Sequence, residues 1–289
     1  MGSKFKKNIK LAPYTTFRIG GTAKYFFTAK TKKELIKAIG ESKKMKIPIF
    51  VLGQGSNLLV CDNGFDGLVV KVKNSKFKVK GLKIFAEAGV PLSEVVNESA
   101  EKGLSGLEWA GGIYGTVGGA IRGNAGAFGG EIKDVIGQVE AYDAKTEKIR
   151  IFKANNCCFK YRESIFKKRE NLIVLSAVFK LKKGKKNKIK KEIKNYLDYR
   201  KRNHPLDFPS AGSVFKNPPK KSAGELIEKC GLQGKIIGKA QISLKHANFI
   251  INLGGAKADD VLSLINLAKR EVKEKFKIEL KEEIKYLGF

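Results

Sequence analysis

Cysteine and histidine are scarce in this chain of 289 residues. It has four cysteines, none in a Cys-x-x-Cys spacing, and two histidines. A structural zinc site needs four such ligands at close spacings, so the sequence gives no metal site. Cys157 and Cys158 are adjacent and poorly placed to bridge each other. Free thiols are typical of a reducing cytosol.

Long apolar runs are also missing. No stretch approaches the roughly 18 apolar residues that cross a bilayer, and residues 1–7 lack the apolar core of a signal peptide. We therefore expect a cytoplasmic protein that does not enter a membrane. General disorder is excluded, because 42% of the residues are hydrophobic and can form a sizeable core.

Acidic residues are few, 28 against 58 lysines and arginines, which gives a formal net charge of +30. Such a field attracts nucleic acids and other polyanions, nucleotides included. The alternative is that lysine is simply the solvated surface residue here, since lysines occur from Lys4 to Lys285. No other feature supports nucleic-acid binding, so we expect none.

Helical and strand patterns alternate along the chain. Thr31–Met45 has an apolar stripe at helical spacing behind a capping-box pair, Thr31 and Glu34. A short apolar strand, residues 49–52, follows and runs into a glycine turn, as in α/β units whose loops bind ligands. Further helices are predicted at 91–101, up to Arg202, from Ser222 and from Asp259, and strands at 68–72, 77–79, 82–88, 135–142, 148–152, 172–181, 247–252 and 278–287.

Glycine is concentrated in two segments. The first is Gly53-Gln54-Gly55-Ser56-Asn57, and the second lies within residues 103–130, which hold 11 glycines in 28 positions. Glycine lets backbone N–H groups approach a pyrophosphate, and short polar side chains add donors. One such segment is more simply a tight turn or a close packing contact. Two of them in one chain favour a dinucleotide site.

The common dinucleotide motifs do not fit. Residues 53–58 begin like G-x-G-x-x-G but lack the last glycine, and no P-loop occurs. Neither segment contains His or Cys, so covalent attachment of a flavin at these loops is not expected. A dinucleotide held by backbone and small polar groups remains.

Six motifs together resemble the UDP-N-acetylenolpyruvoylglucosamine reductase family. They follow the family order from about residue 10 to the C-terminus, at residues 14–23, 52–59, 112–120, 161–164, 211–218 and 246–250. The resemblance implies a flavoenzyme of peptidoglycan precursor synthesis with non-covalent FAD and NADPH as hydride donor. It would reduce the enolpyruvyl ether of UDP-N-acetylglucosamine-enolpyruvate to UDP-N-acetylmuramate. The expected partners are the UDP-sugar and NADPH, with no obligate protein partner.

The implied fold is mixed, α/β and α+β. It has a two-lobed FAD-binding domain of the vanillyl-alcohol-oxidase type and a C-terminal α+β domain for the substrate. We predict lobes at residues 1–75 and 76–185 and the substrate domain at 190–289, with the last strand, about 278–289, returning to the flavin lobes. The short interval between residues 162 and 213 resembles the compact subtype, which lacks an inserted loop that carries a substrate-clamping tyrosine.

The sequence departs from the family pattern at a few positions. Gln54 stands where glycine is expected, and Tyr114 where proline is common. Neither change removes a catalytic group. The predicted cofactor contacts are Gly53, Gln54, Gly55, Ser56, Asn57, Leu58, Gly112, Gly115, Thr116, Gly118, Gly119, Asn124 and Gly126.

The resemblance assigns three catalytic residues. Arg162 would grip the substrate carboxylate, where negative charge develops, because a guanidinium binds a carboxylate in two places. Ser213 matches the proton donor, although a Gly-Ser pair is more often a turn. Glu283 matches the family's C-terminal carboxylate, with Glu282 as its rival on the opposite face of a strand.

Other residues near these motifs are weaker candidates. Tyr161, Lys216 and Asn217 are predicted to contact the substrate, and for the last two a plain loop is an equal alternative. His246 could be a base, but a lone histidine beside an apolar strand is more often structural. The nearer rival function is a flavoprotein oxidase, and the rival from another class is a basic nucleic-acid-binding protein.

Overall fold

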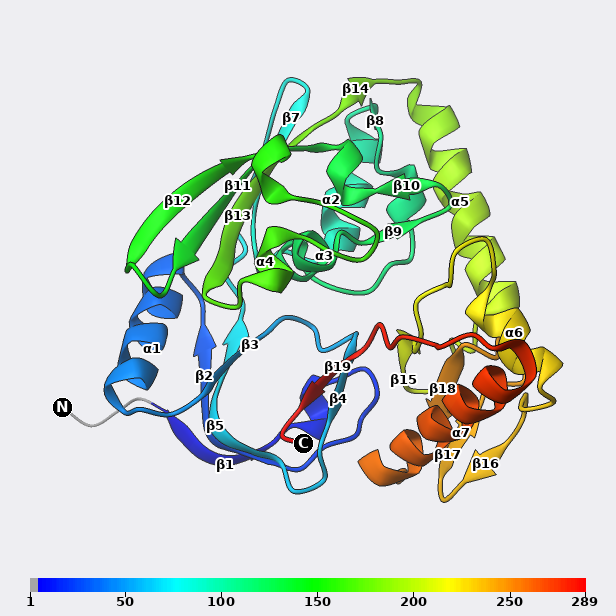
Figure 1. The fold of residues 1–289 in the computed structure, drawn as a ribbon. Coiled ribbons are helices and arrows are strands. Elements are labelled where there is room, and N and C mark those ends of the chain that lie inside the picture. The colour runs from blue at the N-terminus through cyan, green and yellow to red at the C-terminus, as the bar shows by residue number, and fades with distance from the viewer. Residues whose placement is uncertain (1–4) are drawn as a thin grey trace. The chain divides into compact units, whose positions relative to one another are not determined.

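The computed structural model describes residues 5–289, and its contacts divide the chain into two compact units (Figure 1). The first unit comprises the chain up to Phe26, Gln54–Leu68 and Arg200–Phe289, and the second comprises Phe27–Gly53 and Val69–Tyr199. The domain boundaries predicted along the sequence stay a prediction, because this grouping is spatial. Residues 1–4, part of the segment expected not to be a signal peptide, lie outside the described residues.

The first unit joins the two ends of the chain. Strand β19 pairs in parallel with β4, with Lys285 opposite Leu58. A four-stranded antiparallel sheet of order β15-β18-β17-β16 lies against helix α7, and helix α6 packs on α7 (Figure 1). The elements that lie wholly in this unit are β1 (Lys6–Lys10), η1 (Ala12–Tyr14), β4 (Leu58–Val60), β15 (Ser210–Ser213), α6 (Ala223–Lys229), β16 (Ile236–Ile237), β17 (Ala240–Ile242), β18 (Phe249–Asn252), α7 (Ala258–Phe276) and β19 (Lys285–Leu287).

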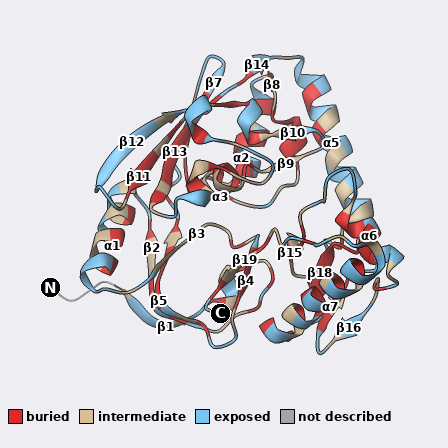
Figure 2. Ribbon diagram, viewed as in Figure 1, coloured by how far each residue is buried: buried red, intermediate tan, exposed pale blue. Residues whose placement is uncertain are grey.

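Helix α7 shows how this unit forms its core. Its apolar residues recur at helical spacing, and Val261, Leu264 and Ala268 are buried with at most 1% of their surface exposed. They pack in one cluster with residues from the N-terminal segment, among them Phe17 and Ile19. Figure 2 shows buried residues in α6, α7 and the sheet, with exposed residues also present along α7. Long-range apolar burial therefore ties the two ends of the sequence together.

The second unit is built on a five-stranded antiparallel sheet of order β12-β11-β13-β7-β6. Helices α2 and α3 pack on this sheet, and α4 packs on β13. Its elements are α1 (Lys32–Lys44), β3 (Ile49–Leu52), β6 (Phe77–Lys80), β7 (Lys83–Glu87), α2 (Leu92–Glu101), β8 (Leu104–Ser105), η2 (Glu108–Ala110), α3 (Val117–Gly123), β9 (Gly126–Ala127), β10 (Gly130–Glu131), η3 (Ile132–Asp134), β11 (Ile136–Asp143), β12 (Lys148–Lys153), η4 (Ala154–Cys157), α4 (Ile165–Lys168), β13 (Leu172–Lys180) and β14 (Lys182–Lys183).

Three elements cross the boundary between the units. These are strands β2 (Thr22–Ala29) and β5 (Phe65–Val72) and helix α5 (Lys186–Asn203). Both strands belong to a sheet of order β1-β2-β5-β3.

The predicted helix over 31–45 is confirmed as α1. Thr31 is its N-cap, and the Thr31 hydroxyl accepts a hydrogen bond of 3.1 Å from the Glu34 N–H. The Glu34 carboxylate accepts one of 2.7 Å from the Lys30 N–H, one residue before the cap. Side chains thus satisfy backbone donors at the start of the helix.

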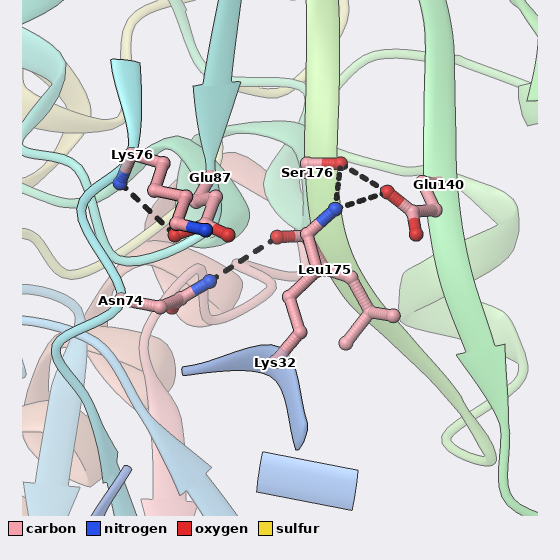
Figure 3. Close-up of polar contacts among 7 residues, drawn as sticks. All are labelled: Lys32, Asn74, Lys76, Glu87, Glu140, Leu175 and Ser176. Atoms are coloured by element: carbon pink, nitrogen blue, oxygen red, sulfur yellow. Dashed lines mark hydrogen bonds and ion pairs between the residues drawn. The ribbon is translucent and has the colours of Figure 1, made fainter. Parts of the chain in front are cut away.

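A polar cluster lies where α1 begins (Figure 3). The Lys32 ammonium donates to Ser176 Oγ at 3.0 Å and to Glu140, and Ser176 Oγ donates to Glu140 Oε2 at 2.5 Å. Burial opposes ionisation of Glu140, but the hydrogen bonds from Lys32 and Ser176 outweigh it and lower the pKa of Glu140. The cluster fixes the start of α1 against β11 and β13.

The predicted closing strand over 278–287 is wrong in length. Only Lys285–Leu287 form a strand, and Glu282 makes a single bridge to Phe215. The alternation of apolar residues suits a strand, but the partner β4 is three residues long, so ladder pairing ends there. None of the helices in the described part of the chain combines the length and apolarity needed to cross a bilayer.

Candidate active site

The two glycine segments meet in the second unit. Gly53 follows β3, and a Cβ atom at this position would lie 2.7 Å from Thr116 Oγ1. The Thr116 hydroxyl also accepts a hydrogen bond of 3.3 Å from the Gly119 N–H, which caps α3. Glycine at 53 therefore allows the first segment to touch the residue that begins the helix of the second.

Glycine has a packing role in the second segment as well. The Gly118 N–H donates to the Ala88 carbonyl at 2.9 Å, and a Cβ at 118 would lie 2.9 Å from Ala88 Cβ. The Val117 N–H donates to the Val90 carbonyl at 2.9 Å. These bonds hold the start of α3 against the connection between β7 and α2. Close packing against Ala88 explains why residue 118 is glycine. The predicted contact of Gly118 with the cofactor stays a prediction.

Arg162 lies in a tight turn of the second unit. Lys160 and Glu163 exchange two backbone hydrogen bonds of 3.0 Å, and Arg162 has a φ of 55°. Asn124, which is fully buried, supports this turn by donating to the Lys160 carbonyl at 3.0 Å. The left-handed backbone at Arg162 is uncommon outside glycine and is held by its surroundings.

The Arg162 side chain lies beside Gly126 and Tyr161. A Cβ at Gly126 would lie 3.4 Å from Arg162 Nη1, an ordinary contact, but 2.7 Å from Glu131 Cγ and from the Gly130 carbonyl oxygen, and the guanidinium carbon lies 5.3 Å from the centre of the Tyr161 ring. Burial opposes ionisation of Glu131, but hydrogen bonds from Lys133 and Asn124 and the charges of Lys133 and Arg162 lower its pKa. Predicted residues 124, 126, 161 and 162 are thus brought together.

Asn124 is also occupied by internal hydrogen bonds. Its amide donates to Glu131 Oε2 at 2.9 Å as well as to the Lys160 carbonyl, and its Oδ1 accepts from the Lys133 N–H at 3.0 Å. The residue therefore connects the end of α3 with the turn that carries Arg162. Its predicted cofactor contact stays a prediction.

In the first unit, the polar end of the first glycine segment touches the C-terminal segment. Gly55 has a φ of 67°, and a Cβ there would lie 2.4 Å from the Tyr14 carbonyl oxygen, so only glycine fits without strain. Two residues on, Asn57 Nδ2 donates to the Glu283 carbonyl at 3.1 Å, and the Lys285 N–H donates to the Asn57 carbonyl at 3.0 Å.

Ser213 and Glu283 lie on two neighbouring antiparallel segments of the first unit. The Glu283 N–H donates to the Val214 carbonyl at 2.7 Å, and the Lys216 N–H donates to the Lys281 carbonyl at 2.9 Å. Ser213 ends strand β15. The fold therefore brings the predicted proton donor and the predicted carboxylate to one place, together with Asn57.

The two candidate glutamates differ in what they contact. Glu282 Oε1 forms an ion pair of 2.8 Å with Lys269 on α7. Glu283 follows it and bonds through its backbone to Val214 and Asn57. Because the Glu282 carboxylate is already paired with Lys269 on α7, Glu283 is the better candidate for the catalytic carboxylate.

The weaker candidates have structural contacts. Asn217 Oδ1 accepts from the Ala223 N–H at 3.0 Å, at the start of α6, and Lys216 joins the backbone pairing described above. His246 Nδ1 accepts from the Asn248 N–H at 3.2 Å, and its ring packs on Phe249. Burial lowers the pKa of His246. These are the contacts of a structural histidine.

Two residues that the sequence did not single out contact the candidate site. Asn248 Oδ1 accepts from the Phe215 N–H at 2.9 Å, and its Nδ2 donates to the Phe215 carbonyl at 2.8 Å, which fixes the segment after Ser213. The Lys71 ammonium donates to the Gly53 carbonyl. The motif at 246–250 contains Asn248, whereas a lysine among 58 basic residues carries no signal of its own.

The residues present fit a flavin dinucleotide. Gly53 and Gly55 lie where a Cβ would collide with Thr116 Oγ1 and the Tyr14 carbonyl, so the backbone forms bare turns. Short polar side chains, Ser56, Asn57 and Thr116, stand beside these turns. Such bare turns with small donors suit a diphosphate.

Comparison with known proteins agrees with this fit. Residues 23–151 match the family described as FAD binding domain, and residues 204–287 match the C-terminal domain of UDP-N-acetylenolpyruvoylglucosamine reductase. The UDP-N-acetylenolpyruvoylglucosamine reductase of Caldicellulosiruptor bescii is 46% identical over 99% of this chain and 92% of its own length. That of Caldanaerobacter subterraneus is 46% identical over 99% of this chain and 94% of its own length.

A solved structure has the same fold. The UDP-N-acetylenolpyruvylglucosamine reductase of Thermus caldophilus superposes with a TM-score of 0.84 at 37% identity and covers 98% of this chain and 99% of its own. The predicted two-part architecture, a FAD-binding domain followed by the reductase C-terminal domain, is confirmed. The chain therefore belongs to the UDP-N-acetylenolpyruvoylglucosamine reductase family.

Proposed function

We propose that this protein reduces the enolpyruvyl ether of UDP-N-acetylglucosamine-enolpyruvate to UDP-N-acetylmuramate, with FAD as cofactor and NADPH as reductant. The observation that carries the assignment is the backbone pairing of segments 214–216 and 281–283. It sets Glu283 beside Val214, the residue that follows Ser213, in a chain that matches the reductases over nearly its full length. The reaction serves peptidoglycan precursor synthesis.

FAD, when bound, supplies reversible hydride transfer between NADPH and the substrate. The residues that would hold it are the bare turns at Gly53 and Gly55 with Ser56 and Asn57, and the second segment at Gly112, Gly115 and Thr116. Their role is to bind and orient the dinucleotide through backbone donors and short side chains.

Ser213 is proposed to give a proton to C2 of the substrate. Hydride addition at C3 leaves negative charge at C2 that spreads into the neighbouring carboxylate. A hydroxyl is a weak acid, but this carbon is strongly basic, and a fixed donor acts on it in the transition state. The bonds from Asn248 to Phe215 and from Glu283 to Val214 hold the segment that carries Ser213.

Arg162 and Glu283 are proposed to act at the substrate carboxylate. A planar guanidinium can hold both carboxylate oxygens and stabilise the charge that develops there. A carboxylate near the same anion would be easier to protonate and could then donate a hydrogen bond. Arg162 belongs to the second unit, so its role rests on its motif and on the turn that fixes it.

We extend the proposal to the setting of the enzyme. NADPH and free thiols are maintained in the reducing cytoplasm, where we place the reaction. All four cysteines are free. We also propose that the two substrates are sufficient partners and that no obligate protein partner is needed. A compact subtype, without a tyrosine-bearing loop over the substrate, stays part of this proposal.

The visible spectrum of the purified protein tests the function, with Ser213→Ala as the decisive variant. The wild-type protein should be yellow, bleach with NADPH under anaerobic conditions and regain its colour when the enolpyruvyl substrate is added. Ser213→Ala should bleach normally but recover its colour roughly 10²-fold to 10⁴-fold more slowly, because only the second half-reaction needs the proton.

Two outcomes would contradict the proposal. Equal loss of both half-reactions in Ser213→Ala would remove the proton-donor assignment. Recovery of colour with oxygen alone, at a rate that the enolpyruvyl substrate does not change, would favour a flavoprotein oxidase instead.

A further inference from the structure

Lys71 is a partly buried lysine beside the first glycine segment. It lies on β5, and its ammonium donates to the carbonyl of Gly53, the residue that follows β3. Among residues 5–289, no carboxylate lies within ion-pair distance of Lys71. Its partner in the protein is therefore a carbonyl dipole and not a charge.

This arrangement is costly for the protein alone. Removing an ammonium from water without a counter-ion is unfavourable, and one carbonyl offsets only part of that cost. Burial and the positive charge of nearby Lys73 lower the pKa of Lys71. Lys32, another partly buried lysine of this unit, has a carboxylate partner in Glu140. An anion that is not part of the chain would complete the environment of Lys71.

The position of Lys71 indicates which anion that is. The carbonyl that it binds belongs to Gly53, and Gly53 is the residue whose missing Cβ permits contact with Thr116. One positive charge is thus attached directly to the junction of the two glycine segments. The ligand assigned to these segments carries a diphosphate, which is the only strongly anionic part of a flavin dinucleotide.

We propose that Lys71 is a positioning residue for the diphosphate of the flavin dinucleotide, holding the Gly53 carbonyl and supplying positive charge at the glycine junction. The inference rests on the proposed function and adds a residue outside the glycine segments to the cofactor site. If Lys71 served only to hold β5 against β3, its replacement would lower the stability of the protein and would weaken the binding of FAD and riboflavin equally.

The test compares FAD with riboflavin, which has the isoalloxazine ring but no diphosphate. Flavin is removed from the full-length protein, and dissociation constants are measured by quenching of flavin fluorescence. Lys71→Met should weaken FAD binding by about tenfold to 100-fold, the effect of losing one charge-assisted interaction. Riboflavin binding should change by less than about threefold. Lys73→Met, which removes an exposed lysine two residues away, should leave both constants within about threefold.

Two further variants separate the charge of Lys71 from its hydrogen bond, and the wild-type protein tests whether FAD binds at all. Lys71→Gln keeps a hydrogen-bond donor for Gly53 but removes the charge, so it should also lose FAD affinity, and it replaces Lys71→Met if that variant fails to fold. Lys71→Arg keeps the charge and should retain most of the affinity. Equal weakening of FAD and riboflavin, or unchanged FAD binding in Lys71→Gln, would overturn the inference. Failure of the wild-type protein to bind FAD would instead overturn the proposed function.

Discussion

Two consecutive glutamates in the C-terminal motif, Glu282 and Glu283, compete for the role of the catalytic carboxylate. Glu282 and Glu283 are consecutive, so they point in different directions along an extended segment. The ion pair of Glu282 with Lys269 and the backbone bonds of Glu283 to Val214 and Asn57 separate their roles. Sequence reasoning favoured Glu283 by motif alignment, and the contacts give a physical reason for the same choice.

Glu283→Gln and Glu282→Gln form a matched pair of variants. Glu283→Gln should lower kcat for NADPH-dependent reduction of the enolpyruvyl substrate by about 10²-fold or more, because an amide N–H is a weaker hydrogen-bond donor than a carboxylic acid to the charge that develops on the substrate carboxylate. Glu282→Gln breaks one half-exposed ion pair and should cost no more than about 1 kcal/mol of stability, with kcat nearly unchanged. Steady-state NADPH oxidation and thermal unfolding measure the two effects.

The control for this pair is flavin content, which should be the same in both variants and in the wild-type protein. A larger loss of kcat in Glu282→Gln than in Glu283→Gln would reverse the assignment of the carboxylate.

Among the elements, the short helix α3 contains glycines in two different environments, one tightly packed and one in open space. Three of its seven residues are glycines. At Gly118 a Cβ would lie 2.9 Å from Ala88 Cβ and 3.2 Å from the Ala88 carbonyl, whereas at Gly123 nothing lies within 4 Å. The sequence predicted cofactor contacts at Gly118 and Gly119 and none at Gly123, and the structure adds that Gly118 is limited by packing, whereas Gly123 is not.

Gly118→Ala and Gly123→Ala should therefore have opposite effects on stability. Gly118→Ala forces α3 away from Ala88 and should destabilise the protein by about 1–3 kcal/mol. Gly123→Ala fills open space and should be neutral or stabilising by up to about 1 kcal/mol, because alanine loses less backbone entropy in a helix. Chemical denaturation of the flavin-free protein measures both without interference from the cofactor. Equal effects would show that the packing of α3 does not limit residue 118.

The whole molecule contains two histidines, and both are close together. His204, which follows α5, has its ring centre 5.4 Å from that of His246 and 4.9 Å from that of Phe249. Burial, with the charges of Arg200 and His246, lowers the pKa of His204 from 6.5 to about 4. The pair is neutral at pH 7, and its protonation opposes folding.

Global stability should accordingly fall as the pH is lowered from 6.5 towards 4. In this window the unfolded chain binds more protons than the folded protein, so the free energy of unfolding rises with pH. The stabilisation is fully present above pH 6.5, and its loss through His204 should be on the order of 2 kcal/mol at pH 4.

Urea denaturation at several pH values measures this dependence, with His204→Asn as the comparison. The variant removes one titrating group, so its stability should change less between pH 6.5 and pH 4 than that of the wild-type protein. Parallel curves for the two proteins would show that His204 does not contribute to the pH dependence.

Much of this protein could be predicted from the sequence, because the signals are local. The Thr31 cap and the apolar stripe predict α1, and the glycines with Ser56, Asn57 and Thr116 predict a dinucleotide site. The six motifs identify the family. Each single motif, cap or glycine segment is a short run of residues, in which spacing and side-chain chemistry carry the information.

Other features needed the tertiary structure, because they depend on contacts between distant residues. The closing segment looks like one long strand, yet only Lys285–Leu287 find a partner in β4. Lys71 is one basic residue among 58 until the fold places it on the Gly53 carbonyl. Backbone pairing across some 70 residues brings Ser213 and Glu283 together. The sequence by itself determined which chemistry is present, and tertiary contacts decided which side chains share a site, because burial and long-range hydrogen bonding are properties of the folded chain.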